Sequence, residues 1–469
     1  MRTIVGRFIM PHSPNTIPWL SKGHYKEATQ TTTACEEIGS RIGQLKPDTI
    51  IVISAHAPSV GNYFYVPKRK IMYGNTGEFS FRQHMIKKEP AWNFIDKLVE
   101  VGKRNSCPIT TFENNPRLRR KHKLNGSFDL ATYIPLYFVE QFWQDYRLVT
   151  ISLSDLPPSD HYLCGTVIER TIQQLEGTYV IIASAELSHK TTEDSPYGYV
   201  EDGLIFNGLV CQSILDGNVN KLLSLDYARR NHVGQCGVDA IAMLYGTGNS
   251  MKFSGDILSY EHTFGIGMVV ASLTHTNKKS KTTNSAIKAR SLELTADKRS
   301  RESEPVRLAR KAIDYYLRTG ETLDDPPPSS IPALMEPSGV FISLVKNGKW
   351  RGFYGNPDPT EFSAAHDIID YALTAVIEND IGPISRKELR EIDIVVELVT
   401  SIEPVSDMSM YDCNSYGVLV KYRQTEGIIV ANAPSIANTE RQYEAALRNA
   451  GAKKNSKVRR YRFTTERFE

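Results

Sequence analysis

An acidic residue and a histidine follow closely on a short run of β-branched residues in the middle of the sequence. Residues 180–182, Val-Ile-Ile, have the composition of a buried strand, and small residues separate them from Glu186 and His189. In open α/β sheets, ligands bind at the carboxyl ends of the strands. A carboxylate and an imidazole at such a place suit acid/base catalysis, so we predict catalytic roles for Glu186 and His189. The alternative is a strand end with solvated polar residues.

Two more histidines follow predicted strands, and each lies close to a proline. His12 lies two residues after the predicted strand 3–10, and His56 lies two residues after the predicted strand 48–54. Imidazoles at neighbouring strand ends can share one metal ion, so His12 and His56 are predicted metal ligands. The alternative for each is an ordinary loop histidine beside a proline.

A metal ion held by two neutral imidazoles needs an anionic ligand to balance its charge in a partly buried site. Glu186 supplies a carboxylate, and Cys236 supplies a thiol at the start of a predicted helix over 238–245, where thiol ionisation is easier. The neighbouring Gln235 supplies neither. We therefore predict the further ligand from the pair Glu186 and Cys236, with Cys236 favoured. A carboxylate favours iron or manganese, and a thiolate favours zinc or copper.

The elements that position these residues alternate between strands and helices over the first 275 residues. Strand–helix–strand order predicts an α/β fold with parallel strands joined by right-handed crossovers. Residues 276–304 are rich in Lys, Ser, Thr and Asn, which predicts a flexible linker. A hairpin, helices and further strands then predict an α+β domain over 305–469. The domain boundaries are thus 1–275, 276–304 and 305–469.

The composition of the 469 residues narrows the class of protein. The 56 basic residues nearly balance the 53 acidic ones, for a net charge of +3, which predicts neither a nucleic-acid nor a membrane partner. No apolar run approaches the ~20 residues of a membrane helix. The start of the chain lacks a signal-peptide pattern, and the six cysteines are scattered, which favours reduced thiols in a cytoplasmic protein.

The ordered motifs resemble two known families. The first 275 residues are similar to the LigB-type class III extradiol dioxygenases, in their Memo-like branch; the matching motifs are Pro11-His12-Ser-Pro14, Ser54-Ala-His56-Ala-Pro58, Ala185-Glu-Leu-Ser-His189, Ser195-Pro-Tyr-Gly-Tyr199, Cys236-Gly237 and Leu258-Ser-Tyr-Glu-His-Thr-Phe-Gly265. The second domain resembles the AMMECR type through Trp350-Arg-Gly-Phe-Tyr-Gly355, Tyr416-Gly-Val-Leu-Val420 and Gln442-Tyr-Glu-Ala-Ala-Leu-Arg-Asn-Ala-Gly451. The fusion resembles the AmmeMemoRadiSam family.

This resemblance implies a cofactor, a substrate class and a partner. The cofactor is a mononuclear non-haem Fe2+ ion, with Zn2+ or Cu as alternatives. The ligand histidines map to His12 and His56, the acid/base histidine maps to His189, and the cysteine of Memo-type relatives maps to Cys236. The implied substrate is a small, aromatic molecule, and the implied partner is a radical-SAM protein of the same system.

Three departures from the family pattern bear on the activity. Gln235 stands where relatives carry a glutamate, Glu186 stands where they carry an aspartate, and Leu130 stands where they carry an active-site histidine. The longer Glu186 side chain can reach toward the metal and replace the lost carboxylate. The function predicted first is a metal-dependent oxidoreductase with an altered site. The alternatives are a binding or scaffold protein whose metal site has decayed, and a metal-dependent hydrolase.

Overall fold

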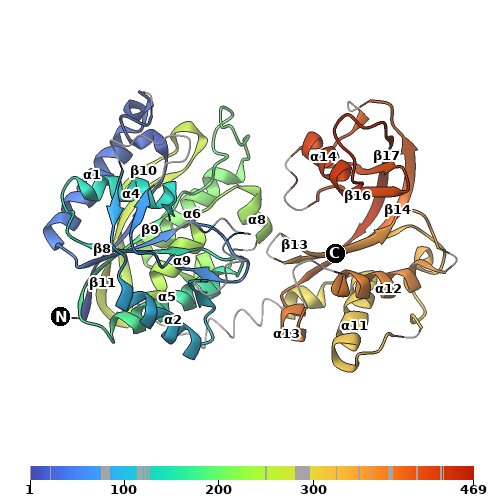
Figure 1. Ribbon diagram of the computed structural model, residues 1–469, viewed down its shortest axis with the longest axis horizontal. Coiled ribbons are helices and arrows are strands. Elements are labelled where there is room, and N and C mark those ends of the chain that lie inside the picture. The colour runs from blue at the N-terminus through green and yellow to red at the C-terminus, as the bar shows by residue number, and fades with distance from the viewer. Residues whose placement is uncertain are drawn as a thin grey trace. The chain divides into compact units, whose positions relative to one another are not determined.

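The computed structural model forms two compact units, residues 1–291 and 292–469 (Figure 1). The described residues are 2–21, 23–74, 85–112, 120, 124, 127–225, 227–248, 251–279, 296–323, 325–346, 349–360, 362–378, 384–407, 410–433, 436 and 438–469.

The first unit is built on a six-stranded mixed sheet with the order β10-β11-β1-β9-β2-β8. Four strands are parallel, and β9 lies between β1 and β2 at the centre of this set. The antiparallel pair β11 and β10 extends the sheet beyond β1. The strand bounds are β1 Arg2–Met10, β2 Thr49–Ser54, β8 Arg147–Ser152, β9 Gly177–Ser184, β10 Met251–Glu261 and β11 Met268–Lys279.

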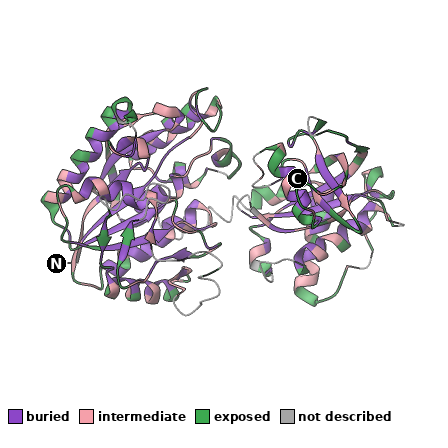
Figure 2. Cartoon of the chain, turned by 45° about the horizontal axis from the view of Figure 1, so that its top comes forward, coloured by how far each residue is buried: buried purple, intermediate pink, exposed green. Residues whose placement is uncertain are grey.

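Helices cover both faces of this sheet, so its central strands are buried on both sides. Alternating residues of the strands divide between two apolar cores, as Ile51 and Val52 of β2 illustrate. This double burial explains why the strands have almost continuous apolar sequences, and Figure 2 shows them as buried. One core contains α2 Trp92–Arg104, α5 Pro158–Ile172, α6 Asp202–Asp216 and α9 Val238–Gly246; the other contains α1 Thr29–Leu45 and α4 Leu130–Glu140.

The last residues of the parallel strands β1, β9 and β2 are aligned with one another, and this alignment positions the residues of the candidate site. Met10 at the end of β1 pairs in register with Ser184 at the end of β9, and Ser184 pairs with Ser54 at the end of β2. Chain segments that leave these three strands therefore start side by side at the carboxyl edge of the sheet.

Shorter elements complete the first unit. Two small sheets pair β3 with β6, and β5 and β7 with β4. Their bounds are β3 Phe64–Tyr65, β4 Met72–Gly74, β5 Lys87–Lys88, β6 Ile109–Thr110 and β7 Ser127–Phe128. The short helices are α7 Asn220–Leu223 and α8 Tyr227–His232, and the 3-10 turns are η1 Pro14–Thr16, η2 His24–Ala28 and η5 Thr263–Gly265.

The second unit is the α+β fold that its sequence predicts. Its six antiparallel strands have the order β13-β12-β14-β17-β15-β16. The strand bounds are β12 Val340–Lys346, β13 Lys349–Asn356, β14 Asp393–Pro404, β15 Gly417–Tyr422, β16 Thr425–Ile429 and β17 Arg459–Phe468. The helical segments are α11 Glu304–Thr319, η6 Pro332–Leu334, α12 Ala364–Ile377, α13 Arg386–Leu389 and α14 Thr439–Asn449.

The predicted linker over 276–304 is too long at both ends. Strand β11 continues to Lys279, because its last residues still pair with β10. At the other end, Arg299 donates to the carbonyl oxygen of Ile392 at 2.8 Å, so this segment is docked on the second unit. Residues 280–295, the middle of the predicted linker, lie outside the described residues. Within the described part of the chain, no helix has both the length and the apolar character needed to cross a bilayer.

Candidate metal centre

Three predicted site residues leave the central strands at the same position. His12, Glu186 and His56 each lie two residues beyond the end of their strand, β1, β9 and β2 respectively. Because these strand ends are in register, the three side chains reach the same region above the carboxyl edge of the sheet. His12 and Glu186 are buried, whereas His56 is exposed. The rings of His12 and His56 lie edge to face, with centroids 4.7 Å apart.

Cys236 reaches this region from the segment that opens α9. The backbone N–H of Cys236 donates to the carbonyl oxygen of Glu186 at 3.4 Å. The next residue, Gly237, lies so close to the chain after β9 that a Cβ atom would be 2.6 Å from the same oxygen. A glycine is therefore required here, and its close approach is what holds Cys236 against the end of β9.

Four side-chain atoms of types that can bind a metal form a closed ring of contacts. The Nε2 atoms of His12 and His189 each lie 3.4 Å from Oε2 of Glu186. The Sγ atom of Cys236 lies 3.5 Å from Nε2 of His12 and 3.8 Å from Nε2 of His189. Two groups, His12–His56–Cys236 and Glu186–His189–Cys236, have ligand atoms within 4.8 Å of one another. The structure thus brings together all five residues predicted for the site.

These spacings fit the coordination shell of one ion. Nitrogen or oxygen ligands about 2.1 Å from a tetrahedral ion lie about 3.4 Å apart, and a thiolate about 2.3 Å away lies about 3.6 Å from a nitrogen ligand. In addition, Oε1 of Glu186 is buried and has no hydrogen-bond partner among the described residues. A buried carboxylate oxygen without a partner is costly in free energy, and a cation would satisfy it. The residues therefore fit a metal ion.

The pKa shifts of His12 and Glu186 favour a neutral imidazole beside an ionised carboxylate. Burial lowers the pKa of His12 to about 4, so its imidazole is neutral at pH 7. Burial alone raises the pKa of Glu186, but the neighbouring His12 and His189 imidazoles outweigh that effect and leave this pKa below its usual value. At neutral pH the site therefore holds a neutral imidazole that can bind a metal and a carboxylate that carries the negative charge.

The expected easy ionisation of Cys236 is wrong for the metal-free protein. Burial raises the pKa of this thiol, and the negative charge of Glu186 raises it further. The partial positive charge at the start of α9 does not offset these two effects. Cys236 is therefore a neutral thiol in the metal-free protein, and its ionisation would have to accompany metal binding.

Two serines and an aspartate that the sequence did not single out orient the histidines. Oγ of Ser184 lies 3.0 Å from Nδ1 of His12. Oγ of Ser54 donates to Asp129 at 2.6 Å and accepts the backbone N–H of His56 at 3.3 Å. The two serines occupy equivalent last positions of adjacent strands. That shared placement is the one sequence signal for their role, once the strand ends are known to be level.

The departures from the family pattern have structural explanations. Gln235 accepts the N–H of Val238 at 2.8 Å through its side-chain oxygen, so it caps the start of α9. Leu130 is the first residue of α4 and packs against an apolar core. Neither residue supplies a charged or titratable group to the site.

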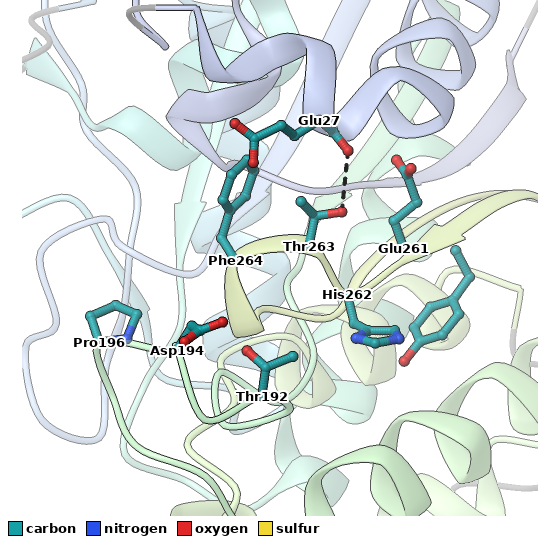
Figure 3. Close-up of a pocket in the computed structure, with 9 residues that line it drawn as sticks. Glu27, Thr192, Asp194, Pro196, Glu261, His262, Thr263 and Phe264 are labelled. Atoms are coloured by element: carbon teal, nitrogen blue, oxygen red, sulfur yellow. Dashed lines mark hydrogen bonds between the residues drawn. The ribbon is translucent and has the colours of Figure 1, made fainter.

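A pocket of about 720 Å³ adjoins the segment that follows His189 (Figure 3). The backbone N–H of Thr191 donates to the carbonyl oxygen of Gly265 at 3.1 Å. This hydrogen bond connects the segment that follows His189 to the 3-10 turn η5, and both segments line the pocket. Glu261 is already engaged there, accepting the N–H of Thr31 at 2.7 Å. The pocket is lined by Glu27, Thr192, Asp194, Pro196, Tyr260, Glu261, His262, Thr263 and Phe264.

Two family models match the chain, one for each unit. The model described as the catalytic LigB subunit of aromatic ring-opening dioxygenase matches residues 6–271, which is more than half of the chain. The AMMECR1 model matches residues 306–469. The chain therefore belongs to the LigB family and carries an AMMECR1 domain in the same polypeptide.

Three bacterial proteins are similar to all or part of this chain. A protein of Clostridium acetobutylicum is 29% identical over 448 residues, which are 95% of each chain. A protein of Thermotoga maritima is 31% identical over 169 residues, which are 35% of this chain and 96% of that protein. A solved Escherichia coli K12 protein has 13% identity and a TM-score of 0.35, over 57% of this chain and 98% of that one.

Proposed function

We propose that the first unit is a metal-dependent oxidoreductase related to the class III extradiol dioxygenases, acting on a small aromatic substrate. The observation that carries this proposal is the common placement of His12, Glu186 and His56 beyond three level strand ends, with Cys236 closing the cluster. Membership of the LigB family supports oxygen-dependent chemistry. Fe2+ is the proposed ion, with Zn2+ and Cu as alternatives.

In this proposal His12 and His56 hold the ion, and the pair Glu186 and Cys236 supplies the balancing charge. A redox-active ion bound there would supply the one-electron steps that reactions of dioxygen require. His56 is the exposed member of the cluster, so a substrate would reach the site from its side. Glu186 has the ionised carboxylate expected of an anionic ligand.

His189 is proposed to move protons. Its Nε2 lies beside Oε2 of Glu186, and its ring lies 5.2 Å from that of Tyr197, between centroids. A substrate hydroxyl placed beside this nitrogen could pass its proton to the imidazole, which could return it to a product oxygen. Leu130 offers no second group for this task, so one histidine has to serve where the family pattern provides two.

A second candidate function is binding without turnover, as in a scaffold protein. It is favoured by Leu130, a partly buried apolar side chain that packs against the core at the position where the family resemblance implies a further active-site histidine. The two candidates share the metal site and differ in whether oxygen is consumed.

The test is metal analysis of the full chain purified without oxygen, followed by oxygen uptake with catechols. We expect one bound ion per chain, and loss of that ion in the double variant His12→Ala, His56→Ala. The matched control is His24→Ala, an exposed histidine paired with Glu27 outside the cluster. Unchanged metal content in the double variant would place the site elsewhere. Bound metal without oxygen uptake on any catechol would favour the binding function.

A further inference from the structure

The second unit contains a strongly basic segment that the nearly neutral net charge of the chain conceals. Residues 441–462 include eight lysines and arginines and one acidic residue. The segment runs from α14 into the start of β17. The prediction of no nucleic-acid partner rests on the net charge of the whole chain. It does not apply to this surface, because the positive charge is concentrated in 22 residues.

The fold brings this segment against the hairpin formed by β15 and β16. Strand β17 pairs with β15, and Arg459 lies directly opposite Lys421. The hydroxyl of Thr425, at the hairpin turn, donates to the carbonyl oxygen of Ala450 at 2.7 Å. Helix α14 packs so closely on β16 that a Cβ atom on Gly427 would lie 1.9 Å from the carbonyl oxygen of Ala446. The hairpin turn, the end of α14 and the start of β17 therefore lie next to one another. Figure 1 shows α14 beside the strands of this hairpin.

Five exposed cations on this surface have no carboxylate partner among the described residues. We call them the basic patch, and its members are Arg423, Arg448, Lys453, Lys457 and Arg459. The nearby acids are engaged elsewhere: Glu426 pairs with Lys421 at 2.8 Å, and Glu440 pairs with Lys454 at 3.2 Å.

Local secondary structure explains the position of only one of the three arginines in the basic patch. Arg448 lies in the last turn of α14, where a cation interacts favourably with the helix dipole. The helix dipole does not explain the other two arginines. Arg423 occupies a left-handed turn position with φ 56°, and Arg459 lies opposite Lys421 on the neighbouring strand. The facing cation, Lys421, is itself paired with Glu426 at 2.8 Å, so Arg459 is the member of this strand pair without a carboxylate. A polyanion on this surface would supply the negative partner that Arg459 and Arg423 lack.

Tyrosines alternate with the cations. The charged end of Arg423 lies 5.1 Å from the ring centroid of Tyr422, and that of Lys421 lies 5.9 Å from the ring centroid of Tyr461. Both rings are half-buried. Cations for phosphates beside aromatic rings for bases are the combination with which proteins bind single-stranded nucleic acids. No large apolar side chain is exposed among the described residues of 417–463, so the surface lacks the groups that insert into a membrane.

We propose that the basic patch of the second unit binds single-stranded nucleic acid. The phosphates contact the five cations, and the bases stack against Tyr422 and Tyr461. The contacts involve backbone charge and ring faces, so the binding has little sequence preference. This surface belongs to the second unit, so the proposal is independent of the metal centre.

The test is fluorescence anisotropy of labelled oligo(U) and oligo(dT), about 20 nucleotides long, titrated with the full chain at several salt concentrations. Five phosphate contacts predict a slope of about −3.5 for log K against log salt. The triple variant Arg423→Glu, Lys457→Glu, Arg459→Glu should abolish binding. The corresponding alanine variant should reduce the slope to about −1.4.

The matched control is the triple variant Lys311→Glu, Arg318→Glu, Arg390→Glu, which removes three exposed cations around the other core of the same unit. It should bind as the unchanged chain does. Thermal unfolding of each variant establishes that it is folded. Equal loss in both triple variants, or no binding of either oligonucleotide by the unchanged chain, would overturn the proposal. Binding only to phosphatidylserine vesicles would also overturn it, and would assign the patch to a membrane surface.

Discussion

Oγ of Ser184 lies 3.0 Å from Nδ1 of His12, so Nε2 is the nitrogen of His12 that faces the candidate metal centre. When the Nδ1–H of a neutral imidazole donates to the serine, the lone pair of Nε2 points to Cys236 and Glu186. Such partners of ligand histidines set both the tautomer and the ring orientation.

The change Ser184→Ala should therefore weaken metal binding. We expect the affinity to fall by about 10–100-fold, because the Nδ1–H loses its partner while every ligand atom remains. Competition with a coloured chelator measures the affinity directly. The matched control is Ser152→Ala: Ser152 ends β8 in register with Ser54, but its hydroxyl accepts the N–H of Tyr65 and touches no ligand. Equal losses in both variants would mean a general effect on the strand ends.

The third metal ligand can be assigned by comparing three variants. Glu186→Gln and Cys236→Ser should each reduce metal affinity, because each removes a possible anion from the cluster. Gln235→Ala should leave the affinity unchanged and lower the free energy of unfolding by ~1 kcal/mol, because Gln235 caps α9 through Val238. Metal titration and urea unfolding of the same samples separate the two effects. Weaker metal binding in Gln235→Ala alone would overturn the assignment.

His189 is predicted to act on protons without being needed for the metal. His189→Ala should keep the bound ion and lose oxygen uptake by a factor of ~10²–10⁴ on any substrate that the unchanged chain turns over. Distance alone does not separate the two histidines, because Nε2 of His189 and Nε2 of His12 each lie 3.4 Å from Oε2 of Glu186. Metal analysis of the variant decides it, and loss of the ion would make His189 a ligand.

The sequence predicted the strands and the clustering of their end residues, because apolar runs mark buried strands and level parallel ends bring the next residues together. It did not predict the hydrogen bonds of Ser184 or Ser54. Those contacts join segments 172 and 75 residues apart and depend on the register of the sheet. It also gave the wrong direction for the pKa of Cys236, because burial and a nearby carboxylate are properties of the folded site.

The predicted ends of the linker, at residues 276 and 304, are wrong for a similar reason. The polar composition of residues 276–304 is the same in the part that pairs with β10 as in the rest. Arg299 is polar in sequence, yet it is docked through Ile392. Polar residues that hydrogen-bond to a neighbouring strand or loop cannot be distinguished from linker residues without the partner.

Limited proteolysis should locate the connection between the units. Trypsin is expected to cut first at Lys281, Lys288 or Arg290, because both flanking segments, through Lys279 and from Arg299, are hydrogen-bonded to their own units. Two stable fragments should result, and mass spectrometry identifies their ends. Early cutting inside either unit would contradict this prediction, as would resistance of all three sites.

The buried carboxyl of Glu397 should make the second unit less stable as the pH rises. Burial raises the pKa of Glu397 above its usual value, and the hydroxyl of Thr465 donates to only one of its oxygens, at 2.9 Å. The folded state therefore binds a proton more tightly than the unfolded chain does. The contribution of Glu397 to stability is greatest below about pH 4.5, where both states are protonated, and falls as the pH rises through the raised pKa.

Glu397→Gln removes this ionisation while its amide oxygen can still accept from Thr465. We expect the variant to be more stable than the unchanged chain at pH 7 and nearly equal to it at pH 4, because a neutral amide avoids the free-energy cost of burying a charge. Urea unfolding at the two pH values measures the difference, and the first unit cancels in the comparison. The matched control is Glu403→Gln, an exposed carboxylate paired with Arg462, which should not gain stability at pH 7. A gain for Glu397→Gln that is equal at both pH values would mean that packing, and not ionisation, is responsible.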